Sequence, residues 1–351
     1  MTLDLPELAS GVPLPDDAAQ RRARAALDEL GPSFGRLGEL SAWLAGAQGR
    51  FPTTPLDRVR LVVFAGDHGF AQQEPSTHDT AAIVQATVRG TTTTNALAEQ
   101  TGASVRVVDV AVDADGTGLP EAVIRHKVRR GSGRVEFEDA LTRAEAEAAF
   151  VAGVAVADEE VDAGADLLVV GGLGVRGDIS AATIATLLTG KDVPSVVGHS
   201  SPPDDRAWMR RCAAVRDAAR RGRRVMAQGH DMIDLLATVG GADLAALTGF
   251  VVQSAVRRTP VVLDGLVTCA AAVVARQVNS RVPRWLVAGH RSPDPGQSAL
   301  LDRLRLTPVV DFAIGLDDGF GALLAVPPLR AAADLATSLG ANETEAGSIS
   351  S

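Results

Sequence analysis

Residues 165–180 read ADLLVVGGLGVRGDIS, and this stretch decides the fold. Residues 167–170 are apolar without interruption, which is typical of a strand that is covered on both faces. Four glycines follow the run: Gly171, Gly172, Gly174 and Gly177. An apolar helical pattern resumes at 179–188, so the stretch predicts a buried strand, a glycine loop and a helix. Such a loop either lets the backbone approach a ligand, with free helix N–H groups pointed at it, or is a plain turn.

The rest of the chain alternates between strand and helix patterns. Further strands are predicted at 60–65, 105–112, 195–197, 259–263, 285–288 and 309–311. Helices are predicted at 18–30, 37–47, 80–102, 142–164, 204–221, 244–255, 267–278 and from Gly321 onward. In the longest of these, Thr142 is the expected N-cap and Glu145 completes a capping box. Alternation of this kind implies right-handed crossovers, so we expect an α/β fold with a parallel, Rossmann-like sheet.

Four regions are expected along the chain. Residues 1–17 carry three prolines and few apolar anchors, which predicts an extended N-terminal arm. Residues 18–59 hold two amphipathic helices before any strand, so they predict a small helical domain, completed by part of the C-terminal helices. Residues 60–340 form the predicted parallel α/β catalytic domain. The polar tail at 341–351 is predicted to be disordered.

Composition excludes several classes of protein. The 351 residues carry a net charge of −9, which argues against a nucleic-acid-binding protein, because binding the phosphate backbone needs a basic surface. The hydrophobic fraction of 46% supports a large core, yet no apolar run has membrane-spanning length and no signal peptide opens the chain. Cys212 and Cys269 are far apart and have no metal-ligand spacing. We therefore expect a reduced cytoplasmic protein without a metal, a cofactor or a membrane partner.

Polar residues cluster where the predicted strands end. Ligands of open parallel sheets bind beyond the carboxyl ends of the strands, so these residues predict a small-molecule site built from several loops. These residues could also have a purely structural role. Asp67 and Asp264 could cap turns, and His68 could be a core histidine whose hydrogen bonds are all made within the protein. The pair Asp317 and Asp318 is more informative, because adjacent carboxylates raise one another's pKa, which suits a general base. A calcium or magnesium site is the competing reading, but EF-hand spacing is absent.

Several ordered motifs resemble one family across residues 20–337. The motifs are GDHG at 66–69, HKVRRGSG at 126–133, ADEEVDAGADLLVVG at 157–171, GGADLAALTGF at 240–250, AVRRTPVVLDG at 255–265 and AGHRSPDPG at 288–296. Together they resemble the nicotinate-nucleotide:dimethylbenzimidazole phosphoribosyltransferases of cobalamin lower-ligand assembly. The resemblance implies a parallel-sheet core with a small helical domain, a homodimer, and two small-molecule substrates, nicotinate mononucleotide and an aromatic base.

The resemblance also implies a reaction: 5-phosphoribose moves to the base with inversion. Nicotinate leaves a pyridinium glycoside as a neutral pyridine and needs no acid, whereas the incoming base must lose its N–H proton to a carboxylate. The family carries that carboxylate as a glutamate in a segment similar to LGEGSG, and residues 316–321 read LDDGFG. This match assigns the catalytic role to Asp318, on an arm shorter by one methylene, about 1.5 Å. The implied substrate-binding residues are Asp67, His68, Ser76, His78, Gly172, Gly174, Arg176, Gly177, Asp178, His199, Asp264, His290, Ser292, Asp317 and Gly319.

Three ligand-facing loops depart from the family pattern. Residues 171–179 read GGLGVRGDI where the family has a segment like GEMGIGNTT, so a carboxylate is lost while Arg176 and Asp178 are added. Residues 197–205 read VGHSSPPDD in place of GxGTGxDD, and Ala82 stands where the family has a glutamine against the base. Three readings stay open: the family reaction, a paralogue with another aromatic acceptor or another donor, and a non-catalytic binding or partner subunit.

Overall fold

A five-stranded, fully parallel sheet forms the centre of the molecule, which confirms the predicted fold class. The computed structural model describes residues 4–74, 78–199 and 204–349. The strands lie in the order β2-β1-β3-β4-β5. Their bounds are β1 Val59–Gly66, β2 Ala103–Ala111, β3 Leu167–Leu173, β4 Val261–Leu263 and β5 Leu286–Ala288.

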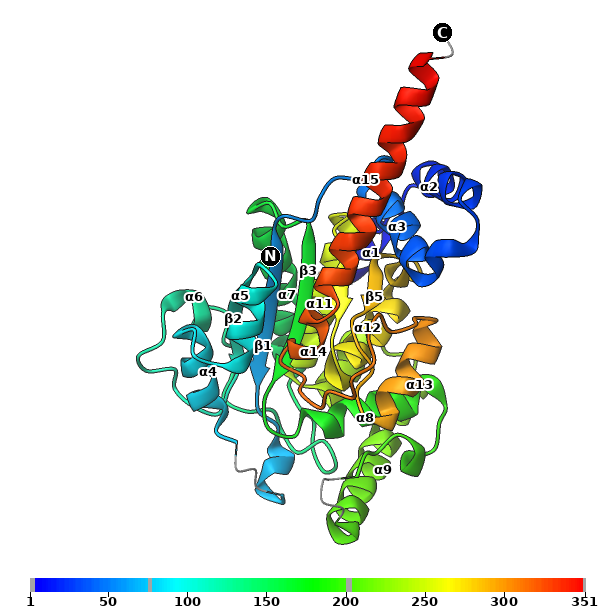
Figure 1. Ribbon diagram of the computed structural model, residues 1–351. Helices are drawn as coiled ribbons and strands as arrows, with labels where there is room; N and C mark the ends of the chain where they lie inside the picture. Colours follow the sequence, from blue (N-terminus) through cyan, green and yellow to red (C-terminus); the bar gives the residue numbers. More distant parts are fainter. Residues whose placement is uncertain (1–3, 75–77, 200–203, 350–351) are drawn as a thin grey trace.

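Both faces of the sheet are covered by helices, as the uninterrupted apolar strands require. Successive side chains of β1 alternate between two cores: Val62 and Phe64 belong to one, Leu61 and Val63 to the other. Figure 1 shows α14 and α15 in front of the sheet and α7 and α11 behind it. The first core involves α7 Arg143–Asp162, α8 Gly177–Thr189, α9 Asp205–Ala227, α11 Ala242–Val256, α12 Leu266–Val278 and α13 Pro295–Leu304. The second involves α3 Gly35–Gln48, α4 Thr80–Val88, α5 Thr93–Gln100, α14 Phe320–Leu323 and α15 Val326–Ile349.

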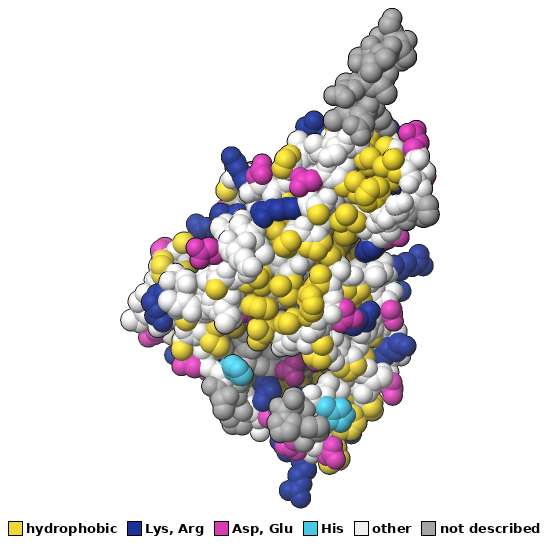
Figure 2. All heavy atoms as spheres, viewed as in Figure 1, with side chains coloured by type: hydrophobic (Ala, Val, Ile, Leu, Met, Phe, Trp, Pro, Cys, Tyr) yellow, Lys and Arg dark blue, Asp and Glu magenta, His cyan; other side chains and the backbone are white. Residues whose placement is uncertain are grey.

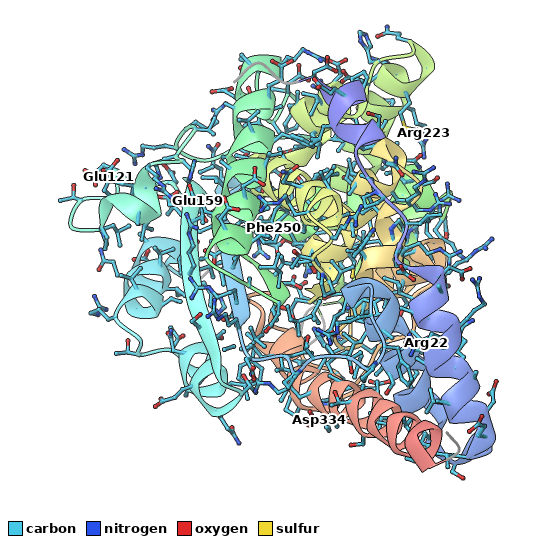
Figure 3. The ribbon with its side chains drawn as sticks, turned by 90° about the horizontal axis from the view of Figure 1, so that it is seen from above. Arg22, Glu121, Glu159, Arg223, Phe250 and Asp334 are labelled. Carbon is cyan, nitrogen blue, oxygen red and sulfur yellow. The ribbon has the colours of Figure 1, made fainter. Side chains whose placement is uncertain are left out.

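A third apolar cluster joins the N-terminal helices to the C-terminal one. It is built on α2 (Asp17–Glu29), α3 and α15, through buried residues such as Leu27, Ala42 and Ala336. Figure 3 shows α2, which carries the labelled Arg22, beside α3 and near α15, which carries Asp334. The remaining short helices are α1 Leu5–Ser10, α6 Glu121–Ile124 and α10 Met232–Leu235. Within the ranges that the structure describes, no helix combines the length and the apolar character needed to cross a membrane.

Helices α7 and α11 cross in direct backbone contact. A Cβ atom on Gly153 would collide with the carbonyl oxygen of Ala246, and one on Gly249 would collide with that of Phe150. Beside this crossing Phe250, labelled in Figure 3, packs edge-on against Phe64 with ring centroids 5.5 Å apart. The two glycines therefore set how close α7 and α11 lie.

Four local predictions were wrong. The arm at 1–17 is not wholly extended, because Asp4 caps the short helix α1. Residues 195–197 form no strand: a 3₁₀ turn at Val193–Ser195 ends at the first of them, and a turn and a bend follow. Residues 309–311 contribute one isolated bridge between His290 and Val310 in place of an edge strand. The tail after Gly340, predicted to be disordered, is helical in the structure, where α15 runs on through Gly340 to Ile349.

Candidate functional site

The strand order places the candidate site at one point of the sheet. β1 lies between β2 and β3, so the chain leaves β1 and β3 toward opposite faces, and an open α/β sheet forms its ligand crevice at such a switch point. Asp67 and His68 follow β1 there, and the loop from Gly174 to Gly177 follows β3. The sheet therefore brings together two motifs that are more than a hundred residues apart.

A crevice of about 210 Å³ lies at this switch point. Its floor is the glycine loop, and three carboxylates enter it from three different elements. The lining residues are His78, Gly172, Leu173, Gly174, Val175, Arg176, Gly177, Asp178, Asp243, Val267 and Asp317. The carboxylates of Asp178, Asp243 and Asp317 make the crevice acidic, which suits a positively charged ring or sugar hydroxyls.

The glycine loop is held in a strained conformation at the start of α8. Arg176 occupies the N-cap position with φ of 67°, a left-handed conformation that is uncommon outside glycine. Its Nε donates to the carbonyl of Glu74 at 2.9 Å, and its Nη2 lies 3.1 Å from the Glu74 carboxylate. No side chain caps α8, and the Ile179 N–H donates to the Arg176 carbonyl, which leaves the N–H groups of Gly177 and Asp178 to a ligand.

His68 and Asp243 form a buried ion pair directly beneath this helix end. His68 Nε2 lies 3.0 Å from Asp243 Oδ2, and His68 Nδ1 lies 3.3 Å from the Ser180 hydroxyl. Burial opposes the charged imidazole, but the carboxylate of Asp243 outweighs it, and the pKa of His68 is raised. The second oxygen of Asp243, Oδ1, has no hydrogen-bond partner among the described residues. That oxygen is the natural acceptor for a hydroxyl in the crevice.

Replacing Asp243 with asparagine is expected to destabilise the protein in a pH-dependent way. Because the folded pKa of His68 is raised, the pair contributes stability that is fully present below about pH 6.5 and lost as pH rises through the folded pKa. The variant should lose about 3 kcal/mol near pH 6, where a buried imidazolium is left unpaired, and less at higher pH. Thermal midpoints of both proteins across pH measure this. A difference between the two thermal midpoints that does not change with pH would contradict a charged His68–Asp243 pair. The control is Asp205→Asn, which makes the same change at the exposed start of α9.

Asp67 connects three loops at the mouth of the crevice. Its Oδ1 accepts hydrogen bonds from the Thr80 hydroxyl at 2.6 Å and from the Val175 N–H at 3.0 Å. Its Oδ2 accepts one from the Asp113 N–H at 2.8 Å. With both oxygens used in this way, Asp67 positions the loops that surround the ligand space.

The adjacent carboxylates Asp317 and Asp318 point in different directions. Asp317 lines the crevice, and its carbonyl accepts a hydrogen bond from the Gly172 N–H at 2.6 Å. Asp318 instead accepts the Thr94 hydroxyl at 2.5 Å and its side chain is not among those that line the crevice. Burial raises the pKa of both groups; that of Asp317 lies well above its usual range, helped by the charge of Asp264. Asp317 therefore combines access to the crevice with the basicity of a proton acceptor.

Asp264 fixes the loop that carries this pair. It is fully buried at the end of β4, and its two oxygens accept the N–H groups of Gly319 at 2.8 Å and Ala322 at 2.7 Å. His290 Nε2 lies 3.0 Å from the same carboxylate, which raises the pKa of the imidazole against the opposing effect of burial. Ser292 is buried nearby, where its N–H donates to Gln297 Oε1. These predicted site residues support the loop and do not line the crevice.

A second pocket of about 470 Å³ adjoins the crevice. His78 and Val175 line both spaces, and Asp67, His68 and Thr80 line the second. Figure 2 shows this end of the molecule, where a magenta and a dark-blue side chain lie in a hollow below the front helices.

Two predicted residues fall elsewhere. His199 is exposed and stacks on Trp208 of α9, with ring centroids 4.7 Å apart, and it lines neither pocket. Ser76 lies outside the described residues. The main residue that sequence reasoning missed is Asp243, whose only signal is its place after the glycines at 240 and 241. Among the described residues, no group of three or more His, Cys, Asp or Glu side chains is arranged to hold a metal ion.

The sheet order and the crevice at its switch point define a doubly wound α/β protein with a small-molecule site beyond β1 and β3. The family described as phosphoribosyltransferase (DBI_PRT) matches residues 12–347. The chain belongs to this family, which confirms the resemblance inferred from its sequence motifs.

Similar proteins share the name of one enzyme. A nicotinate-nucleotide–dimethylbenzimidazole phosphoribosyltransferase of Streptomyces avermitilis is 48% identical over 345 residues, which cover 96% of this chain and 91% of the relative. The protein of that name from Mycobacterium tuberculosis is 47% identical over 342 residues, covering 96% and 93%. The crystal structure of the enzyme from Thermus thermophilus matches with a TM-score of 0.84 at 32% identity, covering 92% of this chain and 96% of the other.

Proposed function

We propose that this chain carries out the reaction for which its relatives are named: it transfers 5-phosphoribose from nicotinate mononucleotide to 5,6-dimethylbenzimidazole or a similar aromatic base. The product is an α-ribazole 5'-phosphate, used in cobamide lower-ligand assembly. One observation supports the residue roles most strongly. The carboxylate of Asp317 lines the same crevice as Gly177, at the uncapped start of α8.

The crevice offers each part of the donor a chemically suitable neighbour. The free N–H groups at the start of α8 suit the phosphate, because a helix N-terminus favours negative charge. The unpartnered Oδ1 of Asp243 suits a ribose hydroxyl, and Asp178 suits the positively charged pyridinium ring. The acceptor base would enter from the adjoining pocket, past His78.

We propose Asp317 as the proton acceptor. As one nitrogen of the base forms the new bond to the anomeric carbon, the proton on its other nitrogen passes to the carboxylate, and nicotinate leaves with the electrons of the broken bond. Asp318 holds the family's position, but its two carboxylate oxygens already accept hydrogen bonds from the Thr94 hydroxyl and from the Phe320 N–H. Gly172 stands where the family loop has a carboxylate, and the 317–318 loop packs against this strand end. We further propose a homodimer, as the family resemblance implies.

The proposed function is tested by incubating the protein with nicotinate mononucleotide and dimethylbenzimidazole. Release of nicotinate that depends on both substrates, with formation of the ribazole phosphate, is the expected result. No release at high enzyme concentration would count against the reaction. Thermal stabilisation by the mononucleotide without turnover would then favour a binding subunit, and release with another aromatic base would favour a paralogue.

A further inference from the structure

A large cavity among the described residues lies away from the crevice. It has a volume of about 930 Å³ and separates the N-terminal helices α2 and α3 from the sheet edge formed by β5, α12 and α13. Two hydrogen bonds cross it and fix its width: Trp43 Nε1 donates to the Arg284 carbonyl at 3.0 Å, and Arg36 donates to the Thr307 carbonyl at 3.0 Å. We call this cavity the arginine groove.

Six arginines line the arginine groove, although the chain carries a net charge of −9. They are Arg24, Arg36, Arg276, Arg284, Arg303 and Arg305. Within the described residues only Arg36 has an ion-pair partner, Glu39. The pKa of Arg276 is lowered by burial and by the nearby charges of Arg303 and Arg305, so the Arg276 guanidinium lies close enough to these two groups to be repelled by them.

Favourable helix-end positions explain only part of this cluster. Arg276 and Arg303 are in the last turns of α12 and α13, where positive charge interacts well with the helix dipole. Arg305 also lies at the end of α13, but its backbone conformation is unfavourable. It caps α13 with φ of 59°, a position at which glycine is usual and a larger side chain is strained. A strained residue that adds to like-charge repulsion points to a use for its side chain.

The side of the groove formed by the N-terminal helices adds apolar surface. Leu27, Phe34 and Trp43 line it from α2, the following turn and α3, among Arg24, Arg36 and the carboxylates of Asp28 and Glu39. The volume lies in the range of small-molecule sites. Figure 2 shows dark-blue side chains along the right-hand edge of the molecule, from the N-terminal helices down to α13.

We propose that the arginine groove is a second ligand site that binds an organic phosphate, with its phosphates on Arg276, Arg303 and Arg305 and its apolar part against Trp43. Guanidinium groups bind phosphate oxygens in pairs, and three of them match a ligand with more than one phosphate. Filling the groove relieves the repulsion among the arginines. The site is separate from the crevice, so the proposal does not depend on the proposed function.

Titration calorimetry at low ionic strength tests the site, with ATP, pyrophosphate and adenosine as probes and with excess nicotinate mononucleotide to occupy the crevice. ATP and pyrophosphate are expected to bind, ATP more tightly, and adenosine alone not to bind. The variant Arg276→Gln/Arg303→Gln should weaken ATP binding by about tenfold or more. It should keep nicotinate release, because neither residue lines the crevice.

Two further variants make the test specific. Arg216→Gln/Arg220→Gln on exposed α9 removes the same charge from residues near Asp217 and should leave ATP binding unchanged. Arg305→Gly should raise the thermal midpoint without ligand, since it removes strain and repulsion, while weakening ATP binding.

Absence of ATP binding to the wild-type protein would overturn the proposal. An equal loss of ATP affinity in the groove variant and in the α9 variant would also overturn it. A groove variant that changes the oligomeric state and leaves ATP binding intact would identify a subunit contact and would also overturn it.

Discussion

Asp317→Asn is expected to lower the rate of nicotinate release by about 10² to 10⁴-fold, the usual contribution of a positioned general base. The side chain keeps its size and its place in the crevice but can no longer accept the proton of the incoming base. Burial has already raised the pKa of Asp317, so the amide removes an unfavourable buried charge. The thermal midpoint should therefore be unchanged or higher, which separates loss of chemistry from loss of fold. Single-turnover release of nicotinate measures the effect.

Asp318→Asn is the matched control, because it makes the same change one residue along the chain. Its effect should be below about tenfold, since that carboxylate is occupied by Thr94 and not exposed to the crevice. The reverse order of the two effects would move the base to Asp318, the position that the family motif assigns.

The pH profile gives an independent check on Asp317. A general base works only when deprotonated, so a raised pKa predicts that the wild-type rate falls with decreasing pH already above the range of an ordinary aspartate. Asp317→Asn should remove this acidic limb. An acidic limb that persists in the variant would belong to another group.

Gly153→Ala is expected to cost about 3 kcal/mol of folding free energy, at the upper end for overpacking a well-packed core. The added methyl would collide with the backbone of α11 at Ala246, which cannot move aside as a flexible side chain could. Helices α7 and α11 would have to separate, although Phe150 and Phe250 belong to the same buried core and Phe250 packs on Phe64 of β1. Urea denaturation, read as a shift of midpoint at constant slope, measures the loss.

Gly38→Ala in α3 provides the contrast. A Cβ atom there would meet Leu27 and Phe34 at 3.4 Å, an ordinary contact distance. Because alanine favours the helix more than glycine, this variant should be neutral or more stable by up to about 1 kcal/mol. Equal destabilisation by both variants would show that helix propensity, and not the crossing of α7 and α11, controls the outcome.

Local sequence patterns predicted secondary structure correctly where neighbouring residues determine it. The apolar run at 167–170 is a strand, and Thr142 and Glu145 form the predicted capping box, because burial on both faces and capping depend on neighbouring residues. The strand at 195–197 was wrong, since a three-residue apolar pattern does not say whether a partner strand is available. The end of the strand that begins at Leu167 was also placed too early: β3 continues through Gly171 and Gly172, which pair with Val63 and Phe64 of β1.

The sequence by itself determined the parallel α/β fold, the glycine loop and the resemblance to a phosphoribosyltransferase family, because periodicity and ordered motifs are properties of the chain. Only the tertiary structure decided which residues meet. Asp243 reaches His68 across 175 residues of sequence, and Asp317 turns toward the crevice while Asp318 turns toward Thr94. Those relations depend on the order of the strands and on the packing of the loop at 316–319 against β3, which no local pattern encodes.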